Sequence, residues 1–291
     1  MNTNYSGVLL LLLATLLFAI LDSSSKFLTA AFAVPLIVWM RYLTNLGFML
    51  LIVPSAQRRE LVRTSRPGLS ILRGVAHAIS SLFVVLAFST LPLAETTSLV
   101  FTTPLLVALF SGPLLGEKVS LPHWLGIIAG FVGVLLIVRP GGAMSGIGVF
   151  YALACALFYA LYQILTRKLA STEPPMRQLF YSAFSGTLLL SCIVPFYWRN
   201  VLPTFPQMCI ILSLGIYGGV GHFLVNRAFR EVPAALLSPL LYSQLVWATL
   251  LGWLVFAQLP DLLALAGMVV IAASSLGLVL DQRRSRPGRE A

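Results

Sequence analysis

Four charged side chains interrupt the long apolar runs in the first third of the sequence: Asp22, Lys26, Arg41 and Glu95. Within a bilayer such a charge costs about 2.5–3.5 kcal/mol on insertion scales, and residues of this kind mark substrate and ion pathways. An acid can bind an amine or a proton. A lysine or an arginine can bind a carboxylate, the guanidinium with two parallel hydrogen bonds. Together these groups would recognise a small zwitterion.

Each of the four also has a structural interpretation. Asp22 and Lys26 are four residues apart and would share one helix face. They would neutralise each other in lipid, or Asp22 would pair with Arg41, whose long side chain can also reach the headgroups. Glu95 follows Pro92 at the expected start of a helix, where an acid is electrostatically favoured.

Two histidines lie in apolar segments, His77 and His222, and Asn226 follows His222 by one helical turn. A histidine changes its charge near neutral pH, which makes both of them candidates for proton coupling. A hydrogen bond between helices is the structural alternative.

Tyr159 and Gln163 have i, i+4 spacing, and Tyr242 and Gln244 interrupt a later apolar run. Amide groups and ring faces of this kind suit the wall of a wet cavity that binds a polar molecule. In membranes the same groups also join helices through hydrogen bonds. We retain these four residues as candidate binding residues.

The sequence contains no recognisable catalytic constellation. Its Ser, His and Asp residues form no hydrolase motif, and the glycine-rich run 215–221 lacks the Lys-Ser or Lys-Thr of a phosphate loop. The three cysteines have no paired spacing, and no cluster of metal ligands is visible. We therefore predict that the chain is not an enzyme and needs no metal or cofactor.

The composition indicates that these residues belong to membrane-spanning segments. Hydrophobic residues make up 58% of the chain and charged residues only 10%, whereas soluble proteins carry about 25% charged residues. The mean hydropathy is +0.93. The formal net charge of +10 comes from basic residues in the short segments between apolar runs, which is typical of a membrane protein and not of a nucleic-acid-binding one.

Apolar segments bounded by charge, proline or glycine predict ten transmembrane helices, since long apolar runs must be helical in hydrocarbon. Their approximate ranges are 7–26, 35–54, 72–91, 94–114, 121–139, 146–166, 178–198, 207–227, 233–256 and 261–280. If both termini are cytoplasmic, most of the 19 Lys and Arg residues fall on the cytoplasmic side. Pro104 and Pro239 are expected to kink the fourth and ninth helices.

An internal repeat relates the two halves. Residues 86–95, LAFSTLPLAE, return as residues 227–236, RAFREVPAAL, with Ala, Phe, Pro and Ala matched 141 positions apart. Each half then carries five helices, and an odd number turns the second half upside down in the membrane. The expected fold is therefore an all-α membrane protein of two inverted five-helix repeats, an architecture associated with alternating access to a central site.

Several stretches resemble the EamA-type branch of the drug/metabolite transporter superfamily. They are Asp22-Ser-Ser-Ser-Lys26, Arg41-Tyr42, PLAETTSLVFTTPLLVALFSGPLLGEK (92–118), WLGIIAGFVGVLLIVRPG (124–141), Ala160-Leu-Tyr-Gln163 with Thr166-Arg167, and PAALLSPLLYSQLVWATLLGWLVFAQLPD (233–261). The resemblance covers nearly the whole chain. It implies one EamA-type repeat over 1–141, a second over 142–281, and a basic cytoplasmic tail over 282–291. Gln258 departs from the family, whose second halves often carry Glu there.

Members of that family are ten-helix carriers of small metabolites in the bacterial inner membrane. The resemblance therefore implies a multi-pass inner-membrane transporter with both termini cytoplasmic. We expect an exporter of amino acids or amino-acid-like compounds, including opine-type metallophores. The alternative is an importer of a ring-bearing metabolite such as riboflavin or S-adenosylmethionine. The expected partners are the small-molecule substrate, the lipid bilayer and protons as a candidate coupling ion, with no nucleic acid.

Overall fold

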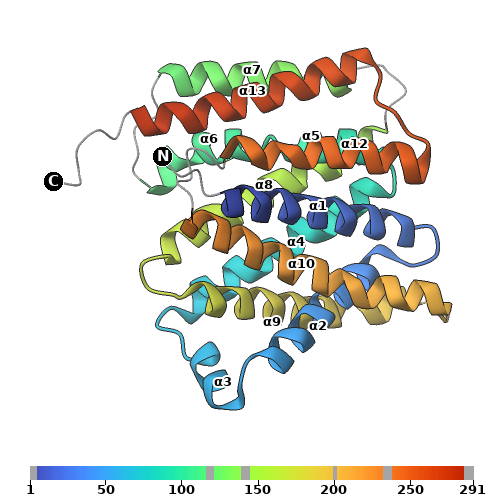
Figure 1. Ribbon diagram of the computed structural model, residues 1–291, viewed down its shortest axis with the longest axis vertical. Helices are drawn as coiled ribbons and strands as arrows, with labels where there is room; N and C mark the ends of the chain where they lie inside the picture. Colours follow the sequence, from blue (N-terminus) through green and yellow to red (C-terminus); the bar gives the residue numbers. More distant parts are fainter. Residues whose placement is uncertain (1–4, 116–120, 139–144, 199–201, 232–237, 285–291) are drawn as a thin grey trace.

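The computed structural model describes residues 5–115, 121–138, 145–198, 202–231 and 238–284 (Figure 1). Throughout these ranges all regular structure is helical. The first half contains α1 (Tyr5–Leu28), α2 (Val34–Ile52), α3 (Ser55–Val62), α4 (Pro67–Phe88), α5 (Leu93–Val100), α6 (Thr103–Leu115) and α7 (Leu121–Val138). The second half contains α8 (Gly146–Leu169), α9 (Pro175–Ile193), η1 (Val194–Tyr197), α10 (Phe205–Glu231), η2 (Ser238–Tyr242), α12 (Ser243–Phe256) and α13 (Leu262–Arg284), where η denotes a 3-10 helix.

Within the described ranges, seven helical segments are long and apolar enough to cross a membrane. They are Ser6–Leu28, Val34–Ile52, Pro67–Phe88, Leu93–Phe110, Gly146–Leu169, Pro175–Tyr197 and Phe205–Val225. Three shorter apolar helices accompany them: Trp124–Val138, Leu240–Phe256 and Leu262–Ser274. The chain is thus an all-helical membrane protein with several spans.

Local sequence explains where several helices begin. Proline lies in the first turn of α2, α4 and α9. The N–H groups of a first turn have no acceptor within the helix, so proline there costs no hydrogen bond. The hydroxyl of Ser145 accepts a hydrogen bond from the Gly148 N–H and caps the start of α8.

The fourth predicted helix is not continuous. A break at Phe101 and Thr102 separates α5 from α6 because Pro104, the second residue of α6, cannot donate to the preceding turn. The hydroxyls of Thr102 and Thr103 bond the carbonyls of Leu99 and Val100, at 2.7 and 2.6 Å, and so satisfy the broken turn.

The second half has a matching junction 141 residues later. There the 3-10 helix η2 gives way to α12, between Tyr242 and Ser243. The rings of Phe101 and Tyr242, one from each junction, are in contact with centroids 5.1 Å apart. The two repeats therefore meet at their equivalent helix breaks.

Helix directions are reversed between the halves. Lys26, near the end of α1, bonds the carbonyl of Leu91 just beyond the end of α4, so these two helices run in the same direction. Arg73, near the start of α4, bonds Thr166, near the end of α8, so α8 runs oppositely. Ala228, near the end of α10, packs against the first half of α1. Consequently α8 and α10 run against their counterparts α1 and α4.

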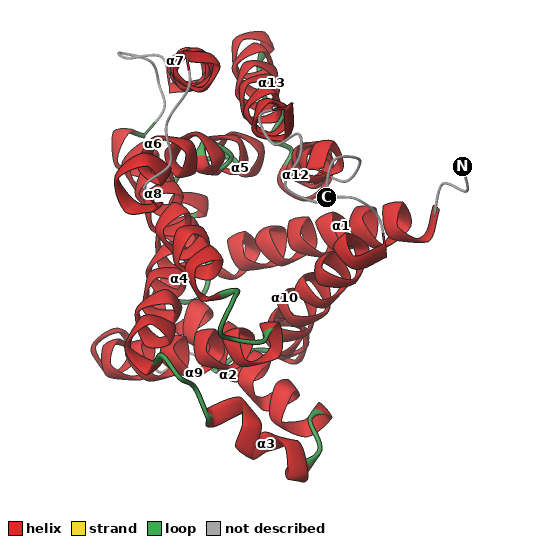
Figure 2. Cartoon of the chain, turned by 90° about the vertical axis from the view of Figure 1, so that its left-hand side faces the viewer, coloured by secondary structure: helices red, strands yellow, loops and turns green. Residues whose placement is uncertain are grey.

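Equivalent helices also make equivalent contacts. α4 packs against α8 and α9, and α10 packs against α1 and α2. α7 and α13 lie side by side at one edge of the bundle, and α3 lies at the opposite edge (Figures 1 and 2). A Cβ atom at Gly133 of α7 would lie 2.9 Å from the carbonyl oxygen of Gly267 of α13, and the reverse distance is 2.6 Å. Glycine at both positions permits this approach of two backbones.

The segment between the second and third predicted helices, 35–54 and 72–91, is more than a connecting loop. Residues Ser55–Val62 form the short polar helix α3. Arg73 belongs to α4, where it is only 3% exposed. It is thus a buried cation of the bundle and not a loop charge.

Candidate functional site

A cavity of about 510 Å³ lies between the two halves. Helices α1, α2, α4, α5 and α6 of the first half contribute to its wall, and so do α8, α10, η2 and α12 of the second. Most of the residues predicted to bind substrate line it: Asp22, Arg41, His77, Tyr159, Gln163, His222, Tyr242 and Gln244. They come from distant parts of the sequence and are brought together by the packing of the repeats.

Asp22 and Arg41 face this cavity without forming an ion pair. A carboxylate oxygen of Asp22 accepts a hydrogen bond of 3.1 Å from the side-chain amide of Gln244. In the part of the chain that the structure describes, no hydrogen bond or ion pair engages the Arg41 guanidinium, although it lies close enough to interact electrostatically with Asp22. The cavity therefore offers a carboxyl group and a guanidinium to a bound molecule.

Histidine and tyrosine rings form one wall of the cavity. His77 stacks on Tyr162 with centroids 4.4 Å apart, and Tyr159 stacks on Tyr162 at 5.4 Å. His222 approaches His77 edge-on at 6.2 Å and lies 5.0 Å from Phe18. The buried Nδ1 atom of His77 has no hydrogen-bond partner among the described residues.

Lys26 does not line the cavity and does not pair with Asp22. Its ammonium donates to the carbonyls of Phe88 and Leu91, at 2.7 and 2.5 Å, and lies 5.4 Å from the ring centre of Phe256. A cation here satisfies carbonyls left free at the end of α4 and complements the helix dipole. The Asp22–Lys26 pair that the i, i+4 spacing suggested is thus not formed, and Lys26 bonds backbone carbonyls that the spacing did not indicate.

Glu95 is also absent from the cavity wall. Glu95 lies in the first turn of α5, as expected, and is 6% exposed. One of its carboxylate oxygens has no hydrogen-bond partner within the described ranges. The side chain of Asn226 is outside the described part of the structure.

Arg73 closes the site behind the aromatic wall, and we did not single it out from the sequence. Its guanidinium lies 4.4 Å from the ring centre of Tyr162. It donates four hydrogen bonds of 2.7–2.9 Å, which go to the hydroxyls of Thr166, Ser182 and Tyr162 and to the carbonyl of Gln178. Arg73 is the second residue of the predicted helix 72–91, and a charge at that position could have identified it from the sequence.

The arrangement is suited to binding a molecule that carries polar or charged groups. Around the cavity, acid, base, amide and ring groups converge from both halves. Among the described residues no three His, Cys, Asp or Glu side chains gather as metal ligands would. Two helical repeats of opposite direction, with several charged and polar side chains around one internal cavity, define a membrane carrier class.

Comparison with known proteins gives the family. Residues 5–139 and 146–280 each match the EamA-like transporter family, and the chain belongs to this family. It is 29% identical over 279 residues to the pseudopaline exporter CntI of Pseudomonas aeruginosa, covering 94% of this chain and 95% of that protein.

Other relatives carry different substrates. Identity is 26% over 227 residues with an S-adenosylmethionine uptake transporter of Rickettsia bellii, covering 78% of this chain and 77% of that one. It is 25% over 277 residues with a riboflavin transporter of Vibrio cholerae, covering 92% and 91%. A solved crystal structure with 22% identity shares the fold, with a TM-score of 0.64 over 98% of this chain and all of the other. The chain is therefore a multi-span membrane metabolite transporter of a bacterial-type family.

Proposed function

We propose that the chain is an alternating-access transporter of the bacterial inner membrane with ten spans in two inverted repeats. The units would be residues 1–141 and 142–281, followed by the cytoplasmic tail 282–291, with both termini in the cytoplasm. The opposed helix directions and the matching contacts of α4 and α10 support this arrangement. Most basic residues then fall on the cytoplasmic side, as the positive-inside rule requires.

The proposed cargo is an amino acid or an amino-acid-like compound, including opine-type molecules, and the proposed direction is export. The observation that carries this proposal is that Asp22 and Arg41 face one cavity without pairing to each other. A substrate ammonium would bind Asp22, and a substrate carboxylate would bind Arg41 with two parallel hydrogen bonds. The amide of Gln244 would hold the Asp22 carboxylate in place.

A specific observation favours a second candidate, the import of a ring-bearing metabolite. Phe18, Phe101, Tyr159 and Tyr242 contribute aromatic side chains to the lining of the same cavity. A flavin or an adenosine moiety would stack between such rings, and relatives named for riboflavin and for S-adenosylmethionine belong to this group.

Protons are the proposed coupling ion, with Asp22, His77 and His222 as the groups that would carry them. All three face the cavity, and an imidazole exchanges a proton near neutral pH. Transport into proteoliposomes should then respond to an imposed pH gradient. Equal rates with and without the gradient would exclude proton coupling without affecting the rest of the proposal.

Counterflow in proteoliposomes tests the cargo directly. The vesicles would be preloaded with zwitterionic amino acids, an opine-type dicarboxylate, riboflavin or S-adenosylmethionine in separate experiments. We expect exchange with the first two groups. Asp22→Asn and Arg41→Gln should each raise the substrate concentration needed for half-saturation about 10- to 150-fold, since a hydrogen bond to a charged group contributes about 1.5–3 kcal/mol. Glu60→Gln, which changes an exposed acid of α3, is the matched control.

The outcomes separate the candidates. Exchange of the ring-bearing compounds alone, with wild-type behaviour of Asp22→Asn, would replace the first proposal by the second. Unchanged exchange of amino acids in both charge variants would remove Asp22 and Arg41 from the binding site.

A further inference from the structure

Arg73 and Leu214 occupy equivalent positions in the two repeats, 141 residues apart on α4 and α10. Each lies in the first half of its helix, and each helix packs against the first two helices of the other repeat. Since α4 and α10 run in opposite directions, the two positions lie toward opposite ends of the bundle. The cavity lies between them, with His77 of α4 and His222 of α10 in its wall.

The surroundings of Arg73 are polar and continue to the end of the bundle. Beyond the hydrogen bonds of Arg73, the side-chain amide of Gln178 donates to the carbonyl of Glu173 at 3.0 Å. Glu173 lies in the loop between α8 and α9 and is only 2% exposed. One of its carboxylate oxygens accepts hydrogen bonds from the Thr64 and Ser65 hydroxyls and from the Ser65 N–H, at 2.6–3.0 Å. The other oxygen forms an ion pair of 2.8 Å with Arg177.

These contacts join the two repeats, because Thr64 and Ser65 belong to the link between α3 and α4 and Glu173 to the second half. Burial by itself would raise the pKa of Glu173. The hydrogen bonds from Arg177, Thr64 and Ser65 outweigh it and lower the pKa to about 2. The carboxylate is therefore ionised at physiological pH and holds the link in place. We call Arg73, Gln178, Glu173, Thr64 and Ser65 the polar cluster.

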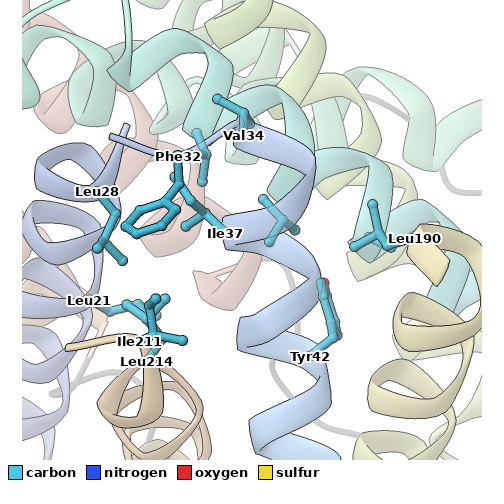
Figure 3. Close-up of a cluster of buried hydrophobic side chains, with 12 residues drawn as sticks. Leu21, Leu28, Phe32, Val34, Ile37, Tyr42, Leu190, Ile211 and Leu214 are labelled. Atoms are coloured by element: carbon cyan, nitrogen blue, oxygen red, sulfur yellow. The ribbon is translucent and has the colours of Figure 1, made fainter. Parts of the chain in front are cut away.

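The surroundings of Leu214 are apolar. Leu214 packs in one buried group with Ile211 of α10, Leu21 and Leu28 of α1, and Ile37 of α2 (Figure 3). Phe32 and Val34, at the turn from α1 into α2, complete it. We call these seven residues the apolar cluster. It joins the repeats at the opposite end of the cavity from the polar cluster.

We propose that the polar and apolar clusters are the two gates of the transporter, and that the repeats have given them different chemistry. This inference rests on the proposed alternating-access function. Each cluster fastens one repeat to the other beside the cavity, so each must separate when the cavity opens at its end. Opening the polar cluster exposes groups that water can solvate, whereas opening the apolar cluster exposes hydrocarbon. Opening of the polar cluster therefore depends on the charges of its side chains, whereas opening of the apolar cluster does not.

A native cysteine provides a test that needs no substrate. Cys155 lines the cavity, and Cys192 and Cys209 are exposed elsewhere. With the latter two replaced by serine, a membrane-impermeant methanethiosulfonate would report access to the cavity. Right-side-out and inside-out vesicles would distinguish the two faces of the membrane.

Glu173→Ala removes the acceptor that holds the polar cluster. We expect it to raise Cys155 labelling from the face of the α8–α9 loop about tenfold, which corresponds to about 1.4 kcal/mol. Thr64→Val removes one of the donors to Glu173, together with the contacts of that hydroxyl with Ser70 and the Arg66 N–H, and should act in the same direction with a smaller effect. Glu60→Ala, an exposed acid on the neighbouring α3, is the matched control and should change nothing. Ile211→Ala should raise labelling from the opposite face.

Each result decides something different. Labelling of Glu173→Ala equal to that of Glu60→Ala, while Ile211→Ala opens the opposite face, would overturn the polar gate and leave alternating access intact. Increased labelling of Glu173→Ala from the wrong face would overturn the assignment of the two ends. Absence of labelling from either face in every variant would contradict the proposed transport function itself.

Discussion

Gly74 of α4 should tolerate alanine much less well than Gly68 of the same helix. A Cβ atom at position 74 would lie 2.7 Å from the carbonyl oxygen of Tyr181 and 2.7 Å from the Cβ of Ser185, both on α9. At position 68 nothing lies within 4 Å of such an atom. One of the clashing atoms at position 74 is backbone, so a side-chain rotation cannot relieve it, and α4 and α9 must separate.

The expected magnitude follows from two opposing terms. Overpacking costs about 1–3 kcal/mol, and replacement of a helical glycine by alanine gains at most about 1 kcal/mol. Only Gly74→Ala causes overpacking, whereas both variants gain from the replacement of glycine. Gly74→Ala should therefore be about 1–3 kcal/mol less stable than Gly68→Ala. Because Gly74 follows Arg73, the same substitution should also loosen the polar cluster.

Unfolding in detergent, followed with a thiol-reactive dye, measures this difference. In the background lacking Cys192 and Cys209, the dye reports exposure of the buried Cys155. Gly74→Ala should unfold at lower temperature than wild type, and Gly68→Ala at the same or a higher temperature. Equal unfolding temperatures for the two variants would show that α4 and α9 do not approach as closely as the structure requires.

Three further predictions concern single groups. The pKa of Glu173 is lowered from 4.5 to about 2, so its contacts stabilise the fold fully above pH 4.5 and lose that effect as the pH falls toward 2. In acid denaturation, the stability gap between wild type and Glu173→Gln should therefore narrow across this window; a constant gap would contradict it. Lys26→Met should lose about 1–3 kcal/mol of unfolding free energy, because two buried carbonyls lose a charged donor, and Lys26→Arg should lose less. Ala257 has a left-handed backbone with φ of 53°, so Ala257→Gly should stabilise the protein by about 0.5–1 kcal/mol, and a lower unfolding temperature would oppose this.

The helical segments were largely predictable because apolar length and proline positions act locally. α1 begins and ends within two residues of its predicted range, and α8 begins at the predicted residue. The break at Phe101 was foreseen only as a kink at Pro104, since a sequence does not say which turn will give way. The polar helix α3 escaped prediction because it has no apolar run to mark it.

A binding cavity with charged and aromatic side chains could be predicted from the sequence, but the full set of residues that line it could not. Asp22 and Arg41 were conspicuous as charges in apolar runs, and they do face the cavity. Lys26 was equally conspicuous, yet its partners are backbone carbonyls beyond α4, which no spacing on α1 could indicate. Glu173 was overlooked because an acid in a loop is ordinarily solvated, and only the tertiary fold buries it.

Site-directed labelling in cells can show whether the two repeats have opposite orientations in the membrane, on which the proposed transport mechanism depends. Arg63 and Leu202 lie in the matching segments that precede α4 and α10, and both are exposed, Leu202 at 89%. Each would be replaced by cysteine in a background where the native cysteines are serine, and then treated with an impermeant maleimide in intact cells. We expect Leu202→Cys to react in intact cells and Arg63→Cys to react only after the membrane is permeabilised. Reaction of both positions from the same face would contradict the inverted repeat and the carrier mechanism built on it.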